Sequence, residues 1–407
     1  MNIQHYLVAV FTAAVGLTAI AEDPKPTIAT FGDYGNFKTQ WFAQSDVTSN
    51  DWGTHHNAMI LDIASNLGTK DIYFVDDGQL GVYLNRFELM DLTDYFADYK
   101  SNFYPYAVEK GIDTLGKQRA IPMGSGVGVQ FYRTDLMIAA GVSIEQISGT
   151  WDQYLQAART AKQNGYYIVD NSDAILRLYV HSHLENGAFL FEDENGAYNL
   201  DRDFYTQAYE FAKIFHDEAL AFETGMWNDN WYGAYRGDKL LASVQGIWLS
   251  GHLSVWIAPD QINKFAMAQT PGTKSGNWGG THLIVNKNAD MSVIKPILDS
   301  LIGGSDKADY QAEFNEYGIV STRIDMLENY NEVFYKNYLN QTNVNSVIKK
   351  SIQDLAIIRT HPLDQYAQTL YFTQYYQMVI NDEISIDEAI TQMNQLLADR
   401  LAELTIN

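Results

Sequence analysis

The chain has 407 residues, of which 46% are hydrophobic and 13% aromatic, and this composition excludes a disordered chain. Because it is too long for one small core and contains no cysteine, we expect two lobes without disulfides, thiolate catalysis or cysteine metal ligands. Its 27 basic and 50 acidic residues give a net charge of −23, which repels nucleic acids and anionic lipid surfaces and argues against a nucleic-acid partner.

The N-terminal segment has the features of a secretory signal peptide. An apolar run extends from Tyr6 to Ile20, and Ala19 and Ala21 are small residues at the two positions that a signal peptidase reads. The run of about 15 residues is shorter than the roughly 20 that a membrane-spanning helix needs. We therefore expect cleavage after Ala21, removal of residues 1–21 and a soluble periplasmic protein.

Short apolar segments alternate with amphipathic helical patterns along the chain, which predicts an α/β protein with largely parallel sheets. The predicted strands are Thr27 to Phe31, Asp71 to Val75, Val127 to Tyr132, Tyr166 to Val169, Ser243 to Leu249 and His282 to Val285. The predicted helices include Ala58 to Leu67, Trp151 to Gln163 and Phe204 to Glu218.

Two helix starts carry capping signals. Thr150 and Ser385 are hydroxyl residues with Gln153 and Glu388 three positions later, a spacing that satisfies the free N–H groups of a first turn. The second signal begins an amphipathic terminal helix that we expect to dock on the core. No Pro, Gly and Ser run is long enough for a flexible linker, so we expect the chain to cross between lobes several times as ordered segments.

Known catalytic and metal-binding patterns are missing from the sequence. The glycine pattern from Gly124 to Gly128 precedes a predicted strand, so we interpret it as a hinge crossing and not as a nucleotide site. The pair His55 and His56 has too few convergent partners for a metal site. We expect one of the two to face a cleft as a hydrogen-bonding group, and the sequence predicts no cofactor.

Asp76 and Asp77 follow directly on a predicted strand, at the end where open α/β sheets bind their ligands. The alternative is a solvated turn in which Asp77 caps a helix. A glycosidase would need two carboxylates that face each other across a cleft at about 5 to 9.5 Å, which keeps hydrolysis as a minor alternative.

The tryptophans of the second half are the most informative feature. Trp227, Trp231, Trp248, Trp256 and Trp278 lie within about 50 residues, interleaved with amide, carboxylate and hydroxyl groups. A sugar ring has an apolar face and an equator of hydroxyls, so a carbohydrate site needs flat aromatic rings edged by polar groups. Some of these tryptophans could instead be core residues, and we assign Trp256 to the core. Glycines flank Trp278 and give it no packing partners in its own segment, so it either covers another core or receives a ligand.

Five segments together resemble a known family. They read KDIYFVDDGQLGVYL, AIPMGSGVGVQFYRTDLMIAAGV, TWDQYLQAARTAK, GIWLSGHLSVWIAPD and GNWGGTHLIVNK. In this order and spacing they resemble the extracellular solute-binding proteins of family 1, the periplasmic receptors of carbohydrate-uptake ABC transporters. The resemblance runs from about Thr27 to the terminal helix.

This resemblance implies the two-lobe periplasmic binding protein fold of type II, with three crossover segments and a ligand cleft between the lobes. Lobe 1 would comprise residues 22–127 and 280–317, and lobe 2 residues 128–279 and 318–407. The tract before Val127 and the pair Gly279 and Gly280 would lie at hinge crossings.

The resemblance also implies which residues bind the ligand. Trp278 would stack on a pyranose at the lobe junction, where Gly280 lets the backbone approach the ligand. Stacking candidates from lobe 2 are Trp248, Trp231 and Trp227. Asp77 and His55 would be hydroxyl partners from lobe 1, and Asn171 a polar partner from lobe 2.

The implied function is that of a monomeric, non-enzymatic receptor that captures a sugar or oligosaccharide and delivers it to an ABC import permease. Two alternatives stay open. The same fold could bind a polyamine, which requires carboxylates around aromatic rings, or a ferric chelate, which requires tyrosines and histidine. A secreted glycosidase is the second alternative.

Overall fold

The computed structural model describes residues 24–36, 40–65, 68–272, 274–302, 314, 316–328 and 337–406. The predicted signal peptide, residues 1–21, lies outside the described residues. The strands in the described part are β1 (Thr27–Phe31), β2 (Asp46–Asn50), β3 (Ile72–Asp76), β4 (Ala120–Arg133), β5 (Ala242–Gly246), β6 (Phe265–Ala268) and β7 (Asn277–Val285).

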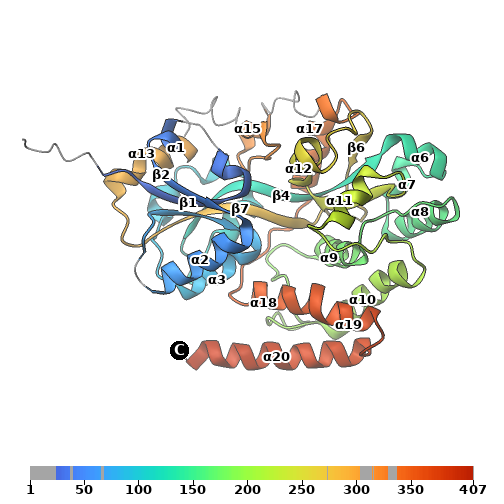
Figure 1. Cartoon of the computed structure of the whole chain (residues 1–407). Helices are drawn as coiled ribbons and strands as arrows, with labels where there is room; N and C mark the ends of the chain where they lie inside the picture. Colours follow the sequence, from blue (N-terminus) through green and yellow to red (C-terminus); the bar gives the residue numbers. More distant parts are fainter. Residues whose placement is uncertain are drawn as a thin grey trace, which may run out of the picture.

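Helices surround these strands (Figure 1). Up to residue 217 they are α1 (Gln40–Ala43), α2 (Trp52–Ala64), α3 (Asp77–Arg86), α4 (Thr93–Phe96), α5 (Pro105–Lys110), α6 (Thr134–Ala140), α7 (Ile144–Ile147), α8 (Trp151–Gln163), α9 (Ser172–His183) and α10 (Arg202–Asp217). The later α-helices are α11 (Asp229–Arg236), α12 (Leu249–His252), α13 (Met291–Ile302), α15 (Ile324–Glu328), α17 (Val344–Gln353), α18 (Asp364–Gln368), α19 (Tyr376–Ile380) and α20 (Ile386–Ile406). Short 3₁₀ turns are η1 (Gly32–Asn36) and η2 (Lys100–Asn102), and π-helical turns are η3 (Leu253–Ile257) and η4 (Thr369–Tyr375).

The strands pair in the order β2-β1-β3-β7-β4-β5, and β6 also pairs with β4. Strand β4 is 14 residues long: the tract 120–127 pairs with β7, and the tract 128–133 pairs with β5 and β6. By its pairing, β4 runs between the half that holds β1 to β3 and the half that holds β5 and β6. Figure 1 shows it crossing the molecule between β1 and β2 on one side and β6 on the other. This continuous strand joins the two halves without a flexible linker.

The expectation of largely parallel sheets is wrong. Among the strands of the described residues, only β1 with β2 and β1 with β3 pair in parallel. Strand β7 pairs antiparallel with β3 and β4, and β4 pairs antiparallel with β5 and β6. Strand β7 arrives late in the chain from the opposite half, so it enters the sheet in the reverse direction.

Several predicted strand bounds are corrected by the pairing. The segment Tyr166 to Val169 makes only isolated bridges, from Tyr167 to Leu240 and from Val169 to Ala221, and is not a strand of the sheet. The strand predicted to reach Leu249 ends at Gly246, and α12 begins at Leu249.

Two glycine-rich segments prove to be strands. The pattern from Gly124 to Gly128 lies inside β4 and not before it, and β7 begins at Asn277, so that Trp278 is a strand residue. Glycines lowered the apparent strand tendency of both segments, but here the two strands approach so closely that a side chain would not fit.

The local helix signals are confirmed. Thr150 and Gln153 form a reciprocal capping box at the start of α8. Ser385 Oγ accepts a hydrogen bond of 3.2 Å from the Glu388 N–H at the start of α20. Ile390 and Met393 of α20 are fully buried, which confirms that this helix docks on the core. The predicted helix Ala58 to Leu67 begins earlier, at Trp52, because Asp51 caps it.

Each half of the structure has its own buried clusters. In β3, Ile72 and Phe74 face one cluster and Tyr73 and Val75 face another, which is the alternation that a strand covered on both faces requires. The clusters of the other half are built around β4, β5 and β6 and include α8, α9, α10 and α20. The exact lobe boundaries stay a prediction. Among the described residues, no helix combines the length and apolar character needed to cross a bilayer.

Candidate ligand-binding site

The carboxyl end of β3 places two carboxylates at the start of α3. Asp76 caps the helix, because its Oδ1 accepts a hydrogen bond of 2.8 Å from the Gly78 N–H. The cap is therefore Asp76 and not Asp77. Burial, together with the neighbouring charge of Asp77, raises the pKa of Asp76 to about 6.

Asp77 is held by two side chains from other elements. Its carboxylate accepts from Lys110 Nζ at 3.1 Å and from His282 Nδ1 at 2.6 Å, and its side chain is only 3% exposed. Burial alone would raise the pKa of Asp77, but Lys110 and His282 hold it below its ordinary value. These contacts bind α5, α3 and β7 together, so Asp77 has a structural role at the site.

Beside these carboxylates, β4 and β7 approach each other closely. Gly279 and Gly280 have φ angles of +85° and +118°, a region that favours glycine. A Cβ on Gly280 would lie 2.6 Å from Asp77 Oδ2, and a Cβ on Gly126 would lie 2.2 Å from the Gly279 carbonyl carbon. The glycines therefore allow the two strands to cross in contact with the carboxylates.

Three of the predicted tryptophans form one group at this crossing. The Trp248 Nε1–H donates a hydrogen bond of 2.7 Å to the Trp278 carbonyl oxygen. The Trp227 ring stacks on Trp248 with centroids 5.4 Å apart and an interplanar angle of 26°. Trp227 is 48% exposed, whereas Trp248 and Trp278 are partly buried. The group therefore leaves one indole open to a ligand above two that are fixed by packing.

Trp231 occupies a different place. Its side chain is fully buried, and its Nε1–H donates a hydrogen bond of 2.6 Å to Asp170 Oδ2. Asp170 also accepts from Ser243, Gln245 and Tyr235, at distances between 2.8 and 3.2 Å. In this structure Trp231 is a core residue that has no surface for stacking, which corrects its assignment as a stacking residue.

Arg177 of α9 lies between two aromatic rings. Its guanidinium carbon is 5.0 Å from the Trp278 centroid and 4.4 Å from the Phe372 centroid, and its Nη1 donates to Gln368 Oε1 at 3.0 Å. Burial lowers the pKa of Arg177 to about 10, and Asp173 partly offsets this effect. One face of Trp278 is thus covered by a cation, and only the remainder of its surface can face a ligand.

Asp173 lies one helical turn before Arg177 on α9. In the part of the chain that the structure describes, its Oδ1 is buried without a hydrogen-bond donor. Burial raises the pKa of Asp173 to about 7, although Arg177 partly offsets the shift. A buried carboxyl oxygen without a donor is suited to accept a hydrogen bond from a bound hydroxyl.

Three further residues lie elsewhere than expected. His55 is buried, and its Nε2 is 2.7 Å from the Phe74 carbonyl oxygen, so it holds α2 against β3 and does not face a ligand. Asn171 is buried and caps α9 by accepting from the Asp173 N–H. Trp256, assigned to the core, is 39% exposed on η3 beside Tyr232, because the π-helical turn directs it outward. Among the described residues, no cluster of three or more His, Asp or Glu could hold a metal ion.

The two halves are in contact near the site. We call this contact the seam, defined as α3 together with residues 359–368. Thr360 Oγ1 donates a hydrogen bond of 3.0 Å to the Lys110 carbonyl oxygen. A Cβ on Gly81 would lie 2.2 Å from the His361 carbonyl oxygen, so α3 meets the opposite segment backbone to backbone.

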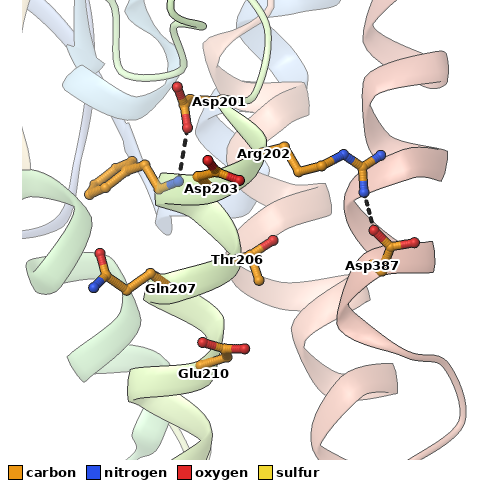
Figure 2. Close-up of a pocket in the computed structure, with 8 residues that line it drawn as sticks. Asp201, Arg202, Asp203, Thr206, Gln207, Glu210 and Asp387 are labelled. Carbon is orange, nitrogen blue, oxygen red and sulfur yellow. Dashed lines mark hydrogen bonds and ion pairs between the residues drawn. The ribbon is translucent and has the colours of Figure 1, made fainter.

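Two open grooves among the described residues lie away from the predicted site residues. The groove in Figure 2 has a volume of about 680 Å³ and is lined by Asp201, Arg202, Asp203, Phe204, Thr206, Gln207, Glu210 and Asp387, from the starts of α10 and α20. Arg202 pairs there with Asp387, and the Asp201 side chain accepts from the Phe204 N–H. A second groove, of about 400 Å³, lies between α3, α18 and the end of α20. Neither contains any of the eight predicted residues.

Three residues at this site, Arg177, Asp173 and Gln368, were not predicted from the sequence. Asp173 and Arg177 are spaced i, i+4 on a helix whose other residues are mostly apolar, and this isolated charged pair is a signal that could have been noted. Gln368 meets Arg177 from 191 positions away, and no local pattern indicates such a contact.

A comparison with protein families matches residues 18–291 to the bacterial extracellular solute-binding proteins. Two similar curated proteins are a lactose-binding protein of Rhizobium radiobacter and an arabinooligosaccharide-binding protein of Bacillus subtilis (strain 168). The first is 27% identical over 272 residues, 62% of this chain, and the second 26% over 256 residues, 58% of this chain. The matches cover 61% and 57% of those relatives, so the chain spans about three fifths of their length.

Solved structures share the fold over nearly the whole chain. A Bifidobacterium animalis subsp. lactis ABC transporter associated binding protein in complex with beta-1,6-galactobiose has a TM-score of 0.75 at 19% identity, covering 93% of this chain and 98% of its own. The galacto-N-biose-/lacto-N-biose I-binding protein of Bifidobacterium longum has a TM-score of 0.74 at 16% identity, covering 94% and 98%. The likeness confirms the predicted α/β binding-protein fold, and with the family match it leads to one conclusion: the chain belongs to the bacterial extracellular solute-binding protein family.

Proposed function

We propose that this protein is the periplasmic receptor of an ABC importer, and that it captures a sugar or oligosaccharide and delivers it to a membrane permease. The observation that carries the proposal is the juxtaposition of the Trp227, Trp248 and Trp278 rings with the Asp76 carboxyl at the crossing of β4 and β7. Flat rings beside buried acceptors suit the apolar face and the hydroxyl equator of a pyranose. Relatives named for binding lactose and arabinooligosaccharides support this choice of ligand.

Capture of the ligand would bring the two lobes together along the seam. Lobe 1, residues 22–127 and 280–317, would supply Asp76, and lobe 2, residues 128–279 and 318–407, would supply Trp227, Trp248 and Asp173. A ligand that contacts both lobes binds the closed form more tightly than the open form, and this difference in affinity stabilises closure. The closed form would then dock on the permease. The protein works as a monomer without turnover, and cleavage after Ala21 releases it into the periplasm.

A thermal-shift screen of the mature protein, residues 22–407, tests the proposal. Monosaccharides, disaccharides and longer oligosaccharides are compared with polyamines and ferric chelates in one plate. A ligand at 100 times its Kd adds about 2.7 kcal/mol to the free energy of unfolding, which raises the Tm by a degree or more.

A rise in Tm with one or a few sugars is the expected result. A response to polyamines or iron without any response to sugars would retain the fold and overturn the proposed ligand. Release of an aryl group from an aryl glycoside by the purified protein would overturn the non-enzymatic assignment.

A further inference from the structure

Trp52 is a half-exposed indole in the half that holds β1 to β3, whereas Trp227 packs on the other half. Trp52 is the first residue of α2, and 45% of its surface is exposed. Its ring lies over the His56 imidazole, with centroids 4.6 Å apart and an interplanar angle of 37°. One face of Trp52 is therefore covered by a neighbouring ring while the side chain stays accessible to solvent.

Hydrogen bonds of His56 fix this platform. His56 Nδ1 donates to the Trp52 carbonyl oxygen at 2.8 Å, and its Nε2 accepts from the Asp76 N–H at 3.2 Å. Burial lowers the pKa of His56 to about 4, so the ring is neutral and can make both bonds at once. The start of α2 and the start of α3 are thereby joined, and Trp52 is held beside Asp76.

A continuous series of groups connects Trp52 with Trp227. The Trp52 side chain lies close enough to the Asp76 carboxyl to act against the rise in its pKa. Asp76 Oδ2 and Trp248 Nε1 lie 3.5 and 3.6 Å from the position that a Cβ on Gly279 would take. There is thus space for about one methyl group between them, over the bare backbone of β7. Trp227 then stacks on Trp248.

Trp227 has a backbone conformation that supports a functional role. Its φ angle is +65°, which is unfavourable for a bulky residue that is neither glycine nor asparagine. Such conformations occur where the surrounding structure requires one particular placement of a side chain. Here the conformation lays the indole over Trp248 while leaving it 48% exposed.

We propose that the ligand is a linear oligosaccharide of at least two rings, with one ring on Trp52, another on Trp227, and a hydroxyl between them donating to Asp76. This inference rests on the proposed function and specifies its ligand. A single pyranose cannot cover both indoles, because the Asp76 carboxyl, Gly279 and Trp248 lie between them. Trp52 is thus a chain-length determinant contributed by the half that holds β1 to β3.

The test is isothermal titration calorimetry with the mono-, di-, tri- and tetrasaccharide of whichever sugar raises the Tm in the screen. Trp52→Ala and Trp227→Ala are compared with the wild type and with Trp256→Ala. Trp256 is the control because it is a similarly exposed indole that packs on Tyr232 and is not itself a member of the series. Its Nε1 donates to His252, whose ring contacts Trp227, so this variant also measures any effect that passes through His252. Thermal melts without ligand verify that each variant is folded.

The expected result is that wild-type affinity rises with chain length, and that each of the first two variants weakens binding of the tri- and tetrasaccharide by about tenfold or more. The affinities of Trp52→Ala and Trp227→Ala for the monosaccharide should stay within about twofold of the wild type. All affinities of Trp256→Ala should do the same, because the loss of a stacking contact would change them by more than that. Wild-type binding that does not strengthen beyond one ring, or unchanged oligosaccharide binding by Trp52→Ala, would overturn this inference while leaving the proposed function intact. A wild type that binds no sugar would overturn both.

Discussion

The indole N–H of Trp248 donates a 2.7 Å hydrogen bond to the main-chain carbonyl of Trp278, 30 positions later in the chain. The bond joins the turn after β5 to the first residues of β7. Because Trp227 stacks on Trp248 and Arg177 lies over Trp278, the same bond sets the relative placement of four side chains. The aromatic part of the candidate site is therefore one packed unit.

We expect Trp278→Ala to weaken sugar binding by roughly 1 to 3 kcal/mol, because both ring contact and the support of Arg177 are lost. Trp248→Phe is the matched variant. It keeps a flat ring under Trp227 and removes only the hydrogen bond, so we expect a smaller loss of about 1 kcal/mol. Isothermal titration calorimetry measures both. Equal affinities of the wild type and Trp278→Ala would show that the ligand lies elsewhere.

Because β4 and β7 cross so closely, we expect that the glycines at the crossing cannot be replaced by residues with a side chain. We expect Gly126→Ala to lower the free energy of unfolding by roughly 1 to 3 kcal/mol or more, because its Cβ would lie 2.2 Å from the Gly279 carbonyl carbon. Gly233→Ala in α11 is the control. No heavy atom lies within 4 Å of its added Cβ, and it should raise stability by about 0.5 to 1 kcal/mol. Urea unfolding distinguishes the two, and a Gly126→Ala protein as stable as the wild type would contradict this crossing.

The buried carboxylate of Asp170 organises the core around Trp231. Asp170→Ala leaves the Trp231 N–H, the Ser243 hydroxyl and the Gln245 amide without this acceptor, while the Tyr235 hydroxyl keeps Ser243 Oγ as an acceptor. We expect the substitution to cost roughly 2 to 5 kcal/mol of folding stability. Asp170→Asn keeps one acceptor oxygen and should lose less. Guanidinium unfolding measures both losses. If the alanine variant were no less stable than the asparagine variant, the hydrogen bonds to Asp170 would not be holding this core together.

The pH dependence of stability should report on Asp173. Burial raises its pKa to about 7 from 3.8, so the folded state binds the proton more tightly than the unfolded state. Its contribution to the free energy of unfolding is therefore largest below about pH 4 and is lost as the pH rises to about 7. Asp173→Asn removes this titration. We expect the variant to be more stable than the wild type at pH 8, by roughly 2 to 4 kcal/mol, with the difference shrinking toward pH 4. Thermal melts between pH 4 and 8 that run parallel for the two proteins would contradict the burial of this carboxyl.

Features set by neighbouring residues could be predicted from the sequence. The capping box of Thr150 and Gln153, the docked face of α20 and the strand Thr27–Phe31 depend on local spacing, and all three are confirmed. The placement of Asp76 and Asp77 at the end of β3 followed from strand and turn chemistry in the same way. The sequence pattern could not decide whether Asp76 or Asp77 caps the helix, because either carboxylate could reach an N–H of the first turn.

The environments of the tryptophans could not be predicted, because burial depends on partners that are far away in sequence. Trp227 and Trp231 are four positions apart, yet one is half-exposed and the other fully buried against Asp170, which lies 61 positions from Trp231. The glycines beside Trp278 suggested a flexible segment. In the structure they belong to β7, where the absence of a side chain lets this strand contact β4. His55 looked like a polar group for a ligand, and the Phe74 carbonyl satisfies it inside the fold.

The sharing of β4 has a consequence for cooperativity. One continuous strand pairs with β7 on one side of the crossing and with β5 and β6 on the other, so neither half can lose its sheet without removing an edge from its neighbour. Partial unfolding of one half would therefore expose a strand edge in the other half, which raises its free-energy cost. Heat should then produce one all-or-none transition with equal calorimetric and van't Hoff enthalpies. A solute bound at the crossing would then stabilise the whole molecule at once.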